Sequence, residues 1–441
     1  METFLILLSL LVLFIVSTFN VTSVTFLFTL LVFFSYVVPY FTLWPTFMSL
    51  GLVNQDYLYG FFVLIFLCLI GFIIGDKAVP TVREHLMPVQ NTLINYERFE
   101  LYSIITGCIG LAGYGYFILA SGASYFMGHL SGDFSVGGYV YELRYFIFAS
   151  VLLLYNLYLT KNLSKKGFLF LLFICAFLTW DAYIQQQRGS WIRLGVIFMF
   201  SYLFHKEGSN PLSITKIFVK YKRILIGGAL LAFLLVITVQ IRKFYSANSS
   251  FTDQVSNTLE VINDNPDLLV AGSGIDEGNE FVTAYNGYQA AEISGVYDYG
   301  QKWLYPFMNF IPRNLWTDKP RWETYSINIF TYIDRYSKIR HAPGSAETGI
   351  VDAFYRFSWL TPFFFFLLGF YTKKLQNRSA YNTNTRLWYI CLYIGCFYFF
   401  TQNMMPMVIF TLYMYIPIWV VTKTCVRRNR AAFYSQIVSI A

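Results

Sequence analysis

The sequence predicts an all-α polytopic membrane protein with about 11 transmembrane helices and one large extracytoplasmic loop. Of its 441 residues, 56% are apolar and only 13% are charged, whereas soluble domains carry about 25% charged residues. The mean hydropathy is +0.50. Residues 241–355 hold 9 Lys and Arg against 14 Asp and Glu, a net charge of −5, although the whole chain has a net charge of +8. These observations exclude a cytosolic enzyme, a nucleic-acid-binding protein and a secreted disulfide scaffold.

Eleven stretches are long and apolar enough to span a bilayer, because a transmembrane helix needs about 20 mostly apolar residues. In chain order they are 3–19, 23–43, 57–75, 101–121, 143–160, 167–185, 190–205, 223–241, 356–372, 387–402 and 405–422. The stretch at 190–205 is short. The last two are separated only by Asn403, Met404 and a turn around Pro406.

The spans divide the chain into transmembrane helices 1–8 within 1–240, a large loop at 241–355, helices 9–11 within 356–422 and a tail at 423–441. Basic residues concentrate in alternate connections and in the tail: Lys77, Arg83, Arg98, Lys161, Lys165, Lys166, Lys206, Lys216, Lys220, Lys222, Arg223, Lys373, Lys374, Arg378, Arg386, Lys423, Arg427, Arg428 and Arg430. Cytoplasmic loops carry an excess of Lys and Arg. The tail is therefore expected in the cytoplasm, and the large loop on the opposite, extracytoplasmic side.

The large loop has a distinct internal pattern. Helical spacing predicts helices over 279–294 and 323–338. Between them lies the segment QKWLYPFMNFIPRNLWTDKPRW, whose Trp, Tyr and Pro content is typical of the membrane–water interface. The loop is too short and too aromatic for an independent catalytic domain, so we expect it to pack onto the helical bundle.

Cysteine and histidine usage predicts neither disulfides in the loop nor a metal site. All six Cys lie in predicted spans or in the tail, and the four His are scattered without metal-type spacing. We therefore predict no metal and no cofactor.

Two arginines near the outer ends of adjoining spans are candidates for phosphate binding. Arg188 and Arg193 belong to QQQRGSWIRLG at 185–195, and Arg193 falls within the apolar region. A charge there is expensive and usually functional. Guanidinium groups bind phosphate oxygens in a bidentate manner. The alternative is that both side chains extend to the lipid headgroups.

Further cations lie in the loop beside aromatic residues. Arg313 and Lys319 flank Trp316 in IPRNLWTDKPRW, and Trp322 closes the segment. This combination suits anionic headgroups and sugar faces. Ordinary anchoring at the membrane interface is the alternative.

The return of the loop to the membrane carries Arg340, His341, Glu347, Asp352 and Arg356. A carboxylate that is desolvated near the bilayer has a raised pKa and can act as a base near neutral pH. Glu347 and Asp352 are five positions apart and do not share one helical face, so at most one is expected to be the base. His341 is a third candidate. A salt bridge between Asp352 and Arg356, at positions i and i+4, is the structural alternative.

Three segments of the chain resemble the Wzy-type O-antigen polymerases, which are bacterial oligosaccharide repeat-unit polymerases. They are a span followed by Gln187, Arg188 and Gly189, the PR-x-LW-x-DKP segment from Pro312 to Pro320, and GIVDAFYRFSWLTP before the next helix. The likeness in layout covers nearly the whole chain. The loop arginines have no Gly eleven positions on, so the paired R-x10-G signature described for the family is absent.

The resemblance implies a fold similar to O-antigen ligases and C-type glycosyltransferases. It implies a metal-independent, inverting glycosyltransferase of lipopolysaccharide biosynthesis in the bacterial inner membrane, with its active site facing the periplasm. Such an enzyme transfers a growing glycan from undecaprenyl pyrophosphate to the non-reducing end of a new lipid-linked repeat unit. The implied partners are undecaprenyl-pyrophosphate-linked oligosaccharides as donor and acceptor, membrane lipids and a chain-length regulator, with no nucleic acid.

This chemistry assigns roles to the candidate residues. A pyrophosphate leaving group needs cations where charge develops. By position, Arg188, Arg313 and Lys319 match family motif residues and Asp352 takes the acidic position, whereas Arg193 is supported by its location. The expected pyrophosphate-binding residues are Arg188, Arg193, Arg313, Lys319 and Arg340. The expected catalytic residues are Asp352, Glu347 and His341, and the expected glycan-binding residues are Trp303, Tyr305, Trp316 and Trp322.

Two other functions compete with this interpretation. An O-antigen ligase, which transfers the same donor to a lipid A core sugar, is the nearest alternative, although Gly does not follow His341 at the spacing of the usual ligase motif. A lipid-linked oligosaccharide flippase is a more distant alternative. Transporters show internal repeats and charges near the bilayer midplane, whereas this sequence has no repeat and its charges gather at the outer face.

Overall fold

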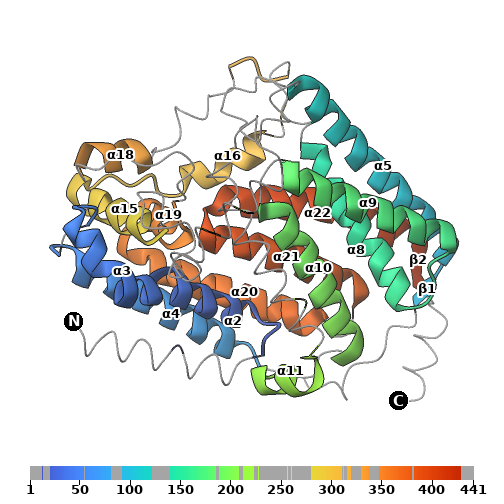
Figure 1. Cartoon of the computed structure of the whole chain (residues 1–441), viewed down its shortest axis with the longest axis horizontal. Coiled ribbons are helices and arrows are strands. Elements are labelled where there is room, and N and C mark those ends of the chain that lie inside the picture. The colour runs from blue at the N-terminus through green and yellow to red at the C-terminus, as the bar shows by residue number, and fades with distance from the viewer. Residues whose placement is uncertain are drawn as a thin grey trace.

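The computed structural model of the chain is a bundle of helices (Figure 1). It describes residues 20–53, 55–80, 92–121, 140, 142–184, 188–207, 212–222, 280–309, 311, 315–318, 329–336, 347–379 and 382–428, with single residues at 12, 227, 256 and 260. Six helical stretches in the described part are long and apolar enough to cross a membrane: Val24–Ser49, Leu58–Ala78, Tyr96–Ser121, Lys165–Ile184, Gly349–Ser379 and Met404–Cys425. The chain therefore has the character of a polytopic membrane protein. The predicted spans 3–19 and 223–241 lie outside the described elements.

The first crossing is a composite rod. It consists of α2 (Val24–Val32), the π-helical turn η1 (Phe33–Val37) and α3 (Val38–Ser49), and α4 (Leu58–Ala78) follows. The side chain of Ser23 caps α2 by accepting a hydrogen bond from the Phe26 amide at 3.1 Å. Pro39 lacks the amide hydrogen that an α-helix requires, and the wider π turn directly before it accommodates that loss. The helix therefore extends beyond the predicted end at residue 43.

The central helices match four predicted spans. They are α5 (Tyr96–Ser121), the 3-10 turn η3 (Leu143–Tyr145), α8 (Phe146–Leu159), α9 (Lys165–Ile184), α10 (Arg188–Glu207) and the short α11 (Ile214–Lys220). α8 and α9 are joined by a tight turn at residues 160–164, in which Ser164 Oγ accepts from the Gly167 amide at 3.1 Å and caps α9.

Three described helices belong to the large loop: α15 (Glu280–Ser294), α16 (Gln301–Asn309) and α18 (Ile329–Tyr336). The helix predicted over 279–294 is confirmed. The described part of the helix predicted over 323–338 covers residues 329–336. Asn286 Nδ2 donates to the Leu52 carbonyl at 2.9 Å, and the Tyr57 amide donates to Tyr285 Oη at 3.3 Å. α15 is thus packed onto the bundle, as predicted for the loop.

The last described helices are α19 (Gly349–Phe357), the 3-10 turn η4 (Ser358–Leu360), α20 (Thr361–Ser379), α21 (Thr383–Thr401) and α22 (Met404–Cys425). The sequence predicted a span starting at residue 356. Instead, α19 is a separate buried helix, and Ser358 interrupts the chain with φ +50°, a backbone conformation that L residues rarely adopt. The predicted boundary at 355/356 therefore falls inside α19, and α20 begins at Thr361.

Two short strands tie the ends of the described bundle together. β1 (Thr92–Ile94) pairs antiparallel with β2 (Val426–Arg428), with Thr92 opposite Arg428. The start of α5 therefore lies beside the end of α22.

Glycines allow the helix α4 to pack directly against α20. A Cβ atom on Gly71 would meet the Pro362 carbonyl, and one on Gly75 would meet the Phe366 carbonyl. From the other side, a Cβ on Gly369 would meet the Phe72 carbonyl. Small residues that allow two backbones to approach are typical of helix interfaces in membranes. Gly110 and Gly113 play the same part between α5 and the start of α8, where their added Cβ atoms would meet Ile147 and Arg144.

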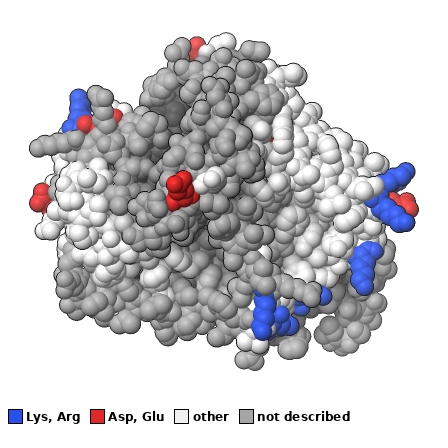
Figure 2. Space-filling model, viewed as in Figure 1, with Lys and Arg blue, Asp and Glu red and all other residues white. Residues whose placement is uncertain are grey.

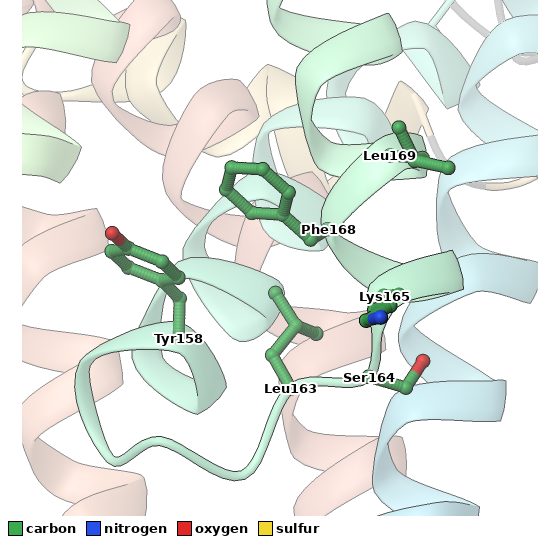
Figure 3. A pocket seen from close by; sticks show the side chains of 6 residues that line it. All are labelled: Tyr158, Leu163, Ser164, Lys165, Phe168 and Leu169. Carbon is green, nitrogen blue, oxygen red and sulfur yellow. The ribbon is translucent and has the colours of Figure 1, made fainter.

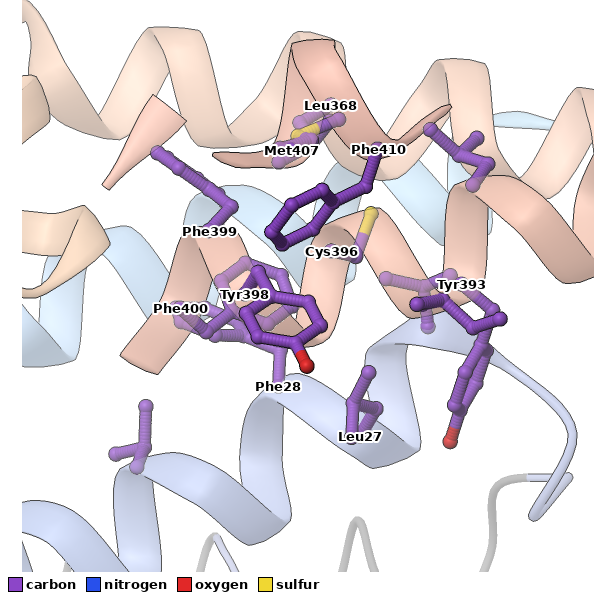
Figure 4. Packing of buried hydrophobic residues seen from close by; sticks show 14 of the residues in the cluster. Leu27, Phe28, Leu368, Tyr393, Cys396, Tyr398, Phe399, Phe400, Met407 and Phe410 are labelled. Carbon is purple, nitrogen blue, oxygen red and sulfur yellow. The ribbon is translucent and has the colours of Figure 1, made fainter. Parts of the chain in front are cut away.

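Aromatic residues fill the centre of the bundle between α2, α20, α21 and α22 (Figure 4). The rings of Phe28 and Phe400 lie 4.5 Å apart, and those of Phe28 and Phe365 lie 5.0 Å apart. These side chains are fully or almost fully buried. The large number of Phe residues thus serves interhelical packing as well as contact with lipid.

Basic side chains gather at one end of the bundle. Lys161 lies in the α8–α9 turn and Lys165 begins α9, whereas Lys216 and Lys220 lie on α11 beside Glu207. Asn377 Nδ2 donates to the Pro80 carbonyl at 3.0 Å, which joins the ends of α4 and α20, each carrying Lys. Gln376 Nε2 donates to Thr22 Oγ1, and the neighbouring Val21 amide donates to the Leu212 carbonyl, so these ends lie near the start of α11. Figure 2 shows blue side chains near α8, α9 and α11. We name this the basic end.

Candidate functional site

Five charged side chains form a buried network at the opposite end of the bundle. They are Asp298, Lys302, Glu347, Asp352 and Arg356, which we name the charge network. The residues come from the segment before α16, from α16 itself and from α19 with the residues preceding it. All five are at most 7% exposed, and Asp352 and Arg356 are 0% exposed. Charged groups in such surroundings must be paired, because desolvation of an isolated ion costs several kcal/mol.

Asp352 is the centre of the charge network and receives donors on both of its oxygens. Oδ1 accepts from Arg356 Nη2 at 2.9 Å and from Lys302 Nζ at 3.5 Å. Oδ2 accepts from the Trp303 indole at 2.8 Å and from the Met404 amide at 3.1 Å. The last bond matters for the fold, because Met404 begins α22 and the first amides of a helix have no partner within that helix.

The two cations each bridge two carboxylates. Lys302 Nζ lies 2.7 Å from Glu347 Oε2 and 3.5 Å from Asp352 Oδ1. Arg356 bonds to Asp352 and, through Nη1, to Asp298. The salt bridge that the i, i+4 spacing of Asp352 and Arg356 predicts is therefore confirmed.

The charge network contains three acids and two bases, so it carries one excess negative charge when all five groups are ionised. Burial raises the pKa of Glu347, although the adjacent Lys302 opposes the shift. Burial likewise raises the pKa of Asp298, opposed by Arg356. A buried excess charge favours protonation of one acid, and Glu347 and Asp298 are the groups whose pKa shifts in that direction.

The local backbone explains how α19 is held in place. Thr348 and Ser358, just before and just after the helix, have φ +57° and +50°. Gly349 lies so close to the Phe399 carbonyl of α21 that a Cβ there would meet it. Only glycine allows this approach, which carries Glu347 and Asp352 to the α21–α22 turn. Asn403 in that turn donates from Nδ2 to Glu347 Oε2 at 3.4 Å.

A second buried cation lies in the first turns of α10. Arg193 is 8% exposed, and its guanidinium carbon lies 4.1 Å from the centre of the Phe410 ring and 4.9 Å from that of Tyr398. Tyr145 and Phe148 supply two more rings at 5.1 and 5.0 Å. Its Nε is buried without a hydrogen-bond partner in the described structure. Cation–π contacts stabilise the charge and leave Nε available to an acceptor.

Arg193 and the charge network share the α21–α22 hairpin. Tyr398 and Phe410, which contact Arg193, belong to α21 and α22, and Met404 between them bonds to Asp352. Tyr398 Oη also donates to the Gly189 carbonyl at 2.9 Å. The two charged regions are therefore at the same end of the bundle, opposite the basic end.

The structure describes only some of the predicted site residues. Arg188 begins α10 and Tyr305 lies in α16, but the side chains of both are outside the described part. Trp316 is described as half-buried. The predicted residues that lie outside the described chain are Arg313, Lys319, Trp322, Arg340 and His341.

Trp303, a predicted glycan-binding residue, is buried. The sequence placed its ring in a groove for sugars, but the side chain is 9% exposed. Its ring lies 4.7 Å from Phe364, 5.1 Å from Phe357 and 6.2 Å from Phe399, measured between centroids. Three aromatic rings therefore hold the Trp303 side chain, and its indole nitrogen donates to Asp352. Trp303 thus stabilises the charge network.

Sequence reasoning missed Asp298, Lys302 and Asn403. Lys302 is the neighbour of Trp303 in a segment noted only for its aromatic residues, and Asp298 lies one helical turn before it. The available signal was a Lys and an Asp four positions apart within an interfacial, aromatic segment, where charges need partners. No family model, curated protein or solved structure matches this chain.

Proposed function

We propose that the protein is a membrane glycosyltransferase that polymerises lipid-linked oligosaccharide repeat units. It would transfer a growing glycan from undecaprenyl pyrophosphate to the non-reducing end of a new lipid-linked repeat. The observation that carries the proposal is the charge network, buried at the end of a membrane bundle opposite the basic end. If the basic end is cytoplasmic, as the positive-inside rule indicates, the charge network lies at the outer face, where the resemblance to Wzy-type polymerases expects the reaction.

Within this proposal, Glu347 is the general base. The transfer needs a group that removes the proton from the acceptor hydroxyl. Both oxygens of Asp352 are occupied by donors, which suits a structural role. The donors to Glu347, Lys302 and Asn403, both reach Oε2, so Oε1 is left to receive a hydroxyl proton within the described surroundings. The raised pKa of Glu347 makes it a stronger base than a solvated carboxylate.

Arg193 is the proposed contact for the departing pyrophosphate. A leaving group that gains negative charge is stabilised by a cation that is already held in position. Four aromatic rings hold the Arg193 guanidinium, and its Nε has no partner among the described groups. Arg193 lies in the second turn of α10, close to the N-terminus of that helix, where the dipole favours an anion.

The test is a gel of surface glycans from the host strain in which this gene is deleted and then restored on a plasmid. Wild-type protein should restore a ladder of polymer lengths, whereas Glu347→Gln and Arg193→Lys should leave a single repeat on the lipid core. Arg193→Lys keeps the charge but loses the planar guanidinium. Asp334→Asn, an exposed acid on α18, is the matched control and should behave as wild type.

The deletion strain also separates the competing functions. Long polymer that remains on its lipid carrier, with no repeats on the core, would identify a ligase instead. Absence of any repeat at the outer face would identify a flippase. A normal ladder in the deletion strain would refute all three functions.

A further inference from the structure

An open pocket lies at the basic end, far from the charge network in the bundle. It occupies about 410 Å³ at the turn between α8 and α9 and is lined by Tyr158, Leu163, Ser164, Lys165, Phe168 and Leu169 (Figure 3). This volume falls within the range of about 300–1,000 Å³ that small-molecule sites occupy in proteins. Nothing in the proposed transfer reaction uses this region.

The pocket has apolar walls that continue along the membrane-facing side of α9. The Tyr158 and Phe168 rings are stacked, with centroids 5.6 Å apart and planes 22° apart. Leu169 is 65% exposed, and Leu172 and Phe173 one turn further on are 51% and 56% exposed. A continuous apolar strip thus leads from the pocket along a helix that is long and apolar enough to cross the bilayer. This shape and chemistry fit an acyl chain.

The rim of the pocket is positively charged. Lys165 lines it, and Lys161 and Lys166 lie in the same turn and the first turn of α9, all three exposed. Lys161 has φ +58°, a position at the end of α8 where glycine is the usual residue. The nearby acid, Glu100, is engaged by the α9 N-terminus, where it accepts from the Ser164 amide at 3.0 Å and from the Ser164 hydroxyl. Lys161, Lys165 and Lys166 therefore outnumber this hydrogen-bonded carboxylate.

We propose that this pocket binds one anionic phospholipid. The phosphate group would lie at Lys165 and Lys161, and one acyl chain would lie over Phe168 and Leu169. Basic pockets at the cytoplasmic ends of transmembrane helices attract anionic headgroups, and each Lys near the surface contributes about 1 kcal/mol. The combination of a basic rim and an apolar wall in one pocket distinguishes this site from the other lysines of the basic end.

The experiment is native mass spectrometry of the purified full-length protein in detergent. Phosphatidylglycerol and phosphatidylcholine are added at matched concentrations, and the bound lipids are counted. The wild-type protein should bind one phosphatidylglycerol in preference to phosphatidylcholine. Lys165→Gln should weaken the binding of phosphatidylglycerol about fivefold. Lys166→Gln removes the same charge from the next position, which does not line the pocket, and should change the affinity less than twofold.

Each other outcome contradicts the proposal. Equal losses in Lys165→Gln and Lys166→Gln would mean that general surface charge attracts the lipid. Equal binding of the two lipids would mean that the headgroup charge is not recognised. Displacement of phosphatidylglycerol by inorganic phosphate alone, with Phe168→Ala leaving the affinity unchanged, would assign the site to a soluble phosphate. Thermal unfolding of each variant checks that these exposed substitutions leave the fold intact.

Discussion

Asp352→Asn is expected to destabilise the protein, although it only replaces one carboxylate oxygen with an NH2 group. Both carboxylate oxygens of Asp352 accept hydrogen bonds, whereas an asparagine offers one oxygen and one NH2 group. If the NH2 group replaces Oδ2, it faces the Trp303 indole and the Met404 amide, which are themselves donors. If it replaces Oδ1, it faces Arg356 and Lys302. Two buried donors lose their acceptor in the first orientation, and three do so in the second, because Oδ1 accepts from both Nε and Nη2 of Arg356 and from Lys302 Nζ.

The magnitude follows from the number of donors that lose a partner. Each buried donor left unsatisfied costs about 1–3 kcal/mol, so two give about 2–6 kcal/mol. Breaking a buried ion pair by removing one partner costs about 3–5 kcal/mol, which agrees with this range. For a chain of 441 residues, we expect the unfolding midpoint to fall by about 2–6 °C.

Glu347→Gln is the matched control, because it makes the same chemical change in the same charge network. The donors to Glu347 both reach Oε2. A glutamine can therefore keep its oxygen at that position and place its NH2 group where Oε1 stands. The bond from Lys302 loses its charge-assisted character, which costs about 1 kcal/mol. The variant should lose activity and keep its fold.

The assay is thermal unfolding of both variants and the wild type in one detergent, followed by tryptophan fluorescence. Asp352→Asn should unfold about 2–6 °C below wild type, and Glu347→Gln should stay within about 1 °C of it. A midpoint for Asp352→Asn within that margin would show that the donors find other acceptors. An equal fall in both variants would show that charge, and not donor geometry, determines the stability.

Three further predictions concern packing and pH. Gly75→Ala should lower the unfolding midpoint, because the added Cβ meets the Phe366 carbonyl. Gly115→Ala is the control: the space around Gly115 is open, so this variant should be neutral or more stable by about 0.5–1 kcal/mol. Equal effects of the two substitutions would contradict the close packing at Gly75. The transfer rate should fall as the pH drops through the raised pKa of Glu347, and a flat profile would exclude it as the base. Hydrogen bonds led by that from Lys220 lower the pKa of Glu207 to about 2 from 4.5, so its contribution to stability is present above pH 4.5 and is lost as the pH falls towards 2. Glu207→Gln should remove that part of the acid dependence of the unfolding midpoint, and an unchanged acid dependence would refute the assignment.

The long helices could be predicted because the bilayer imposes a requirement on local composition. A span such as α4 must be apolar over its whole length, so hydropathy finds it without knowledge of its neighbours. The break between α19 and α20 has no such signature. The segment around Ser358 is mostly apolar, and the break depends on the positive φ of Ser358, which hydropathy does not reveal. The predicted boundary at residue 356 therefore falls inside α19.

The candidate site was predictable where its contacts are local. The pair of Asp352 and Arg356 follows from i, i+4 spacing along one helix. Lys302 and Glu347 are 45 positions apart, and no periodicity connects them. Trp303 shows the same limit, since its residue type indicates an interface but does not indicate which side its ring faces. Burial decides that, and burial comes from the assembled bundle.

The close packing of α4 against α20 has a consequence for the synthesis of the protein. Gly71 and Gly75 of α4 are synthesised early, but α20, which packs against them, is among the last helices to leave the ribosome. Until α20 has been made, the face of α4 that carries Gly71 and Gly75 has no helix packed against it. A ribosome that stalls before α20 would release a chain in which Gly71 and Gly75 have no helix packed against them. The close contact between α4 and α20 can therefore form only late in synthesis, after residues 361–379 have been made.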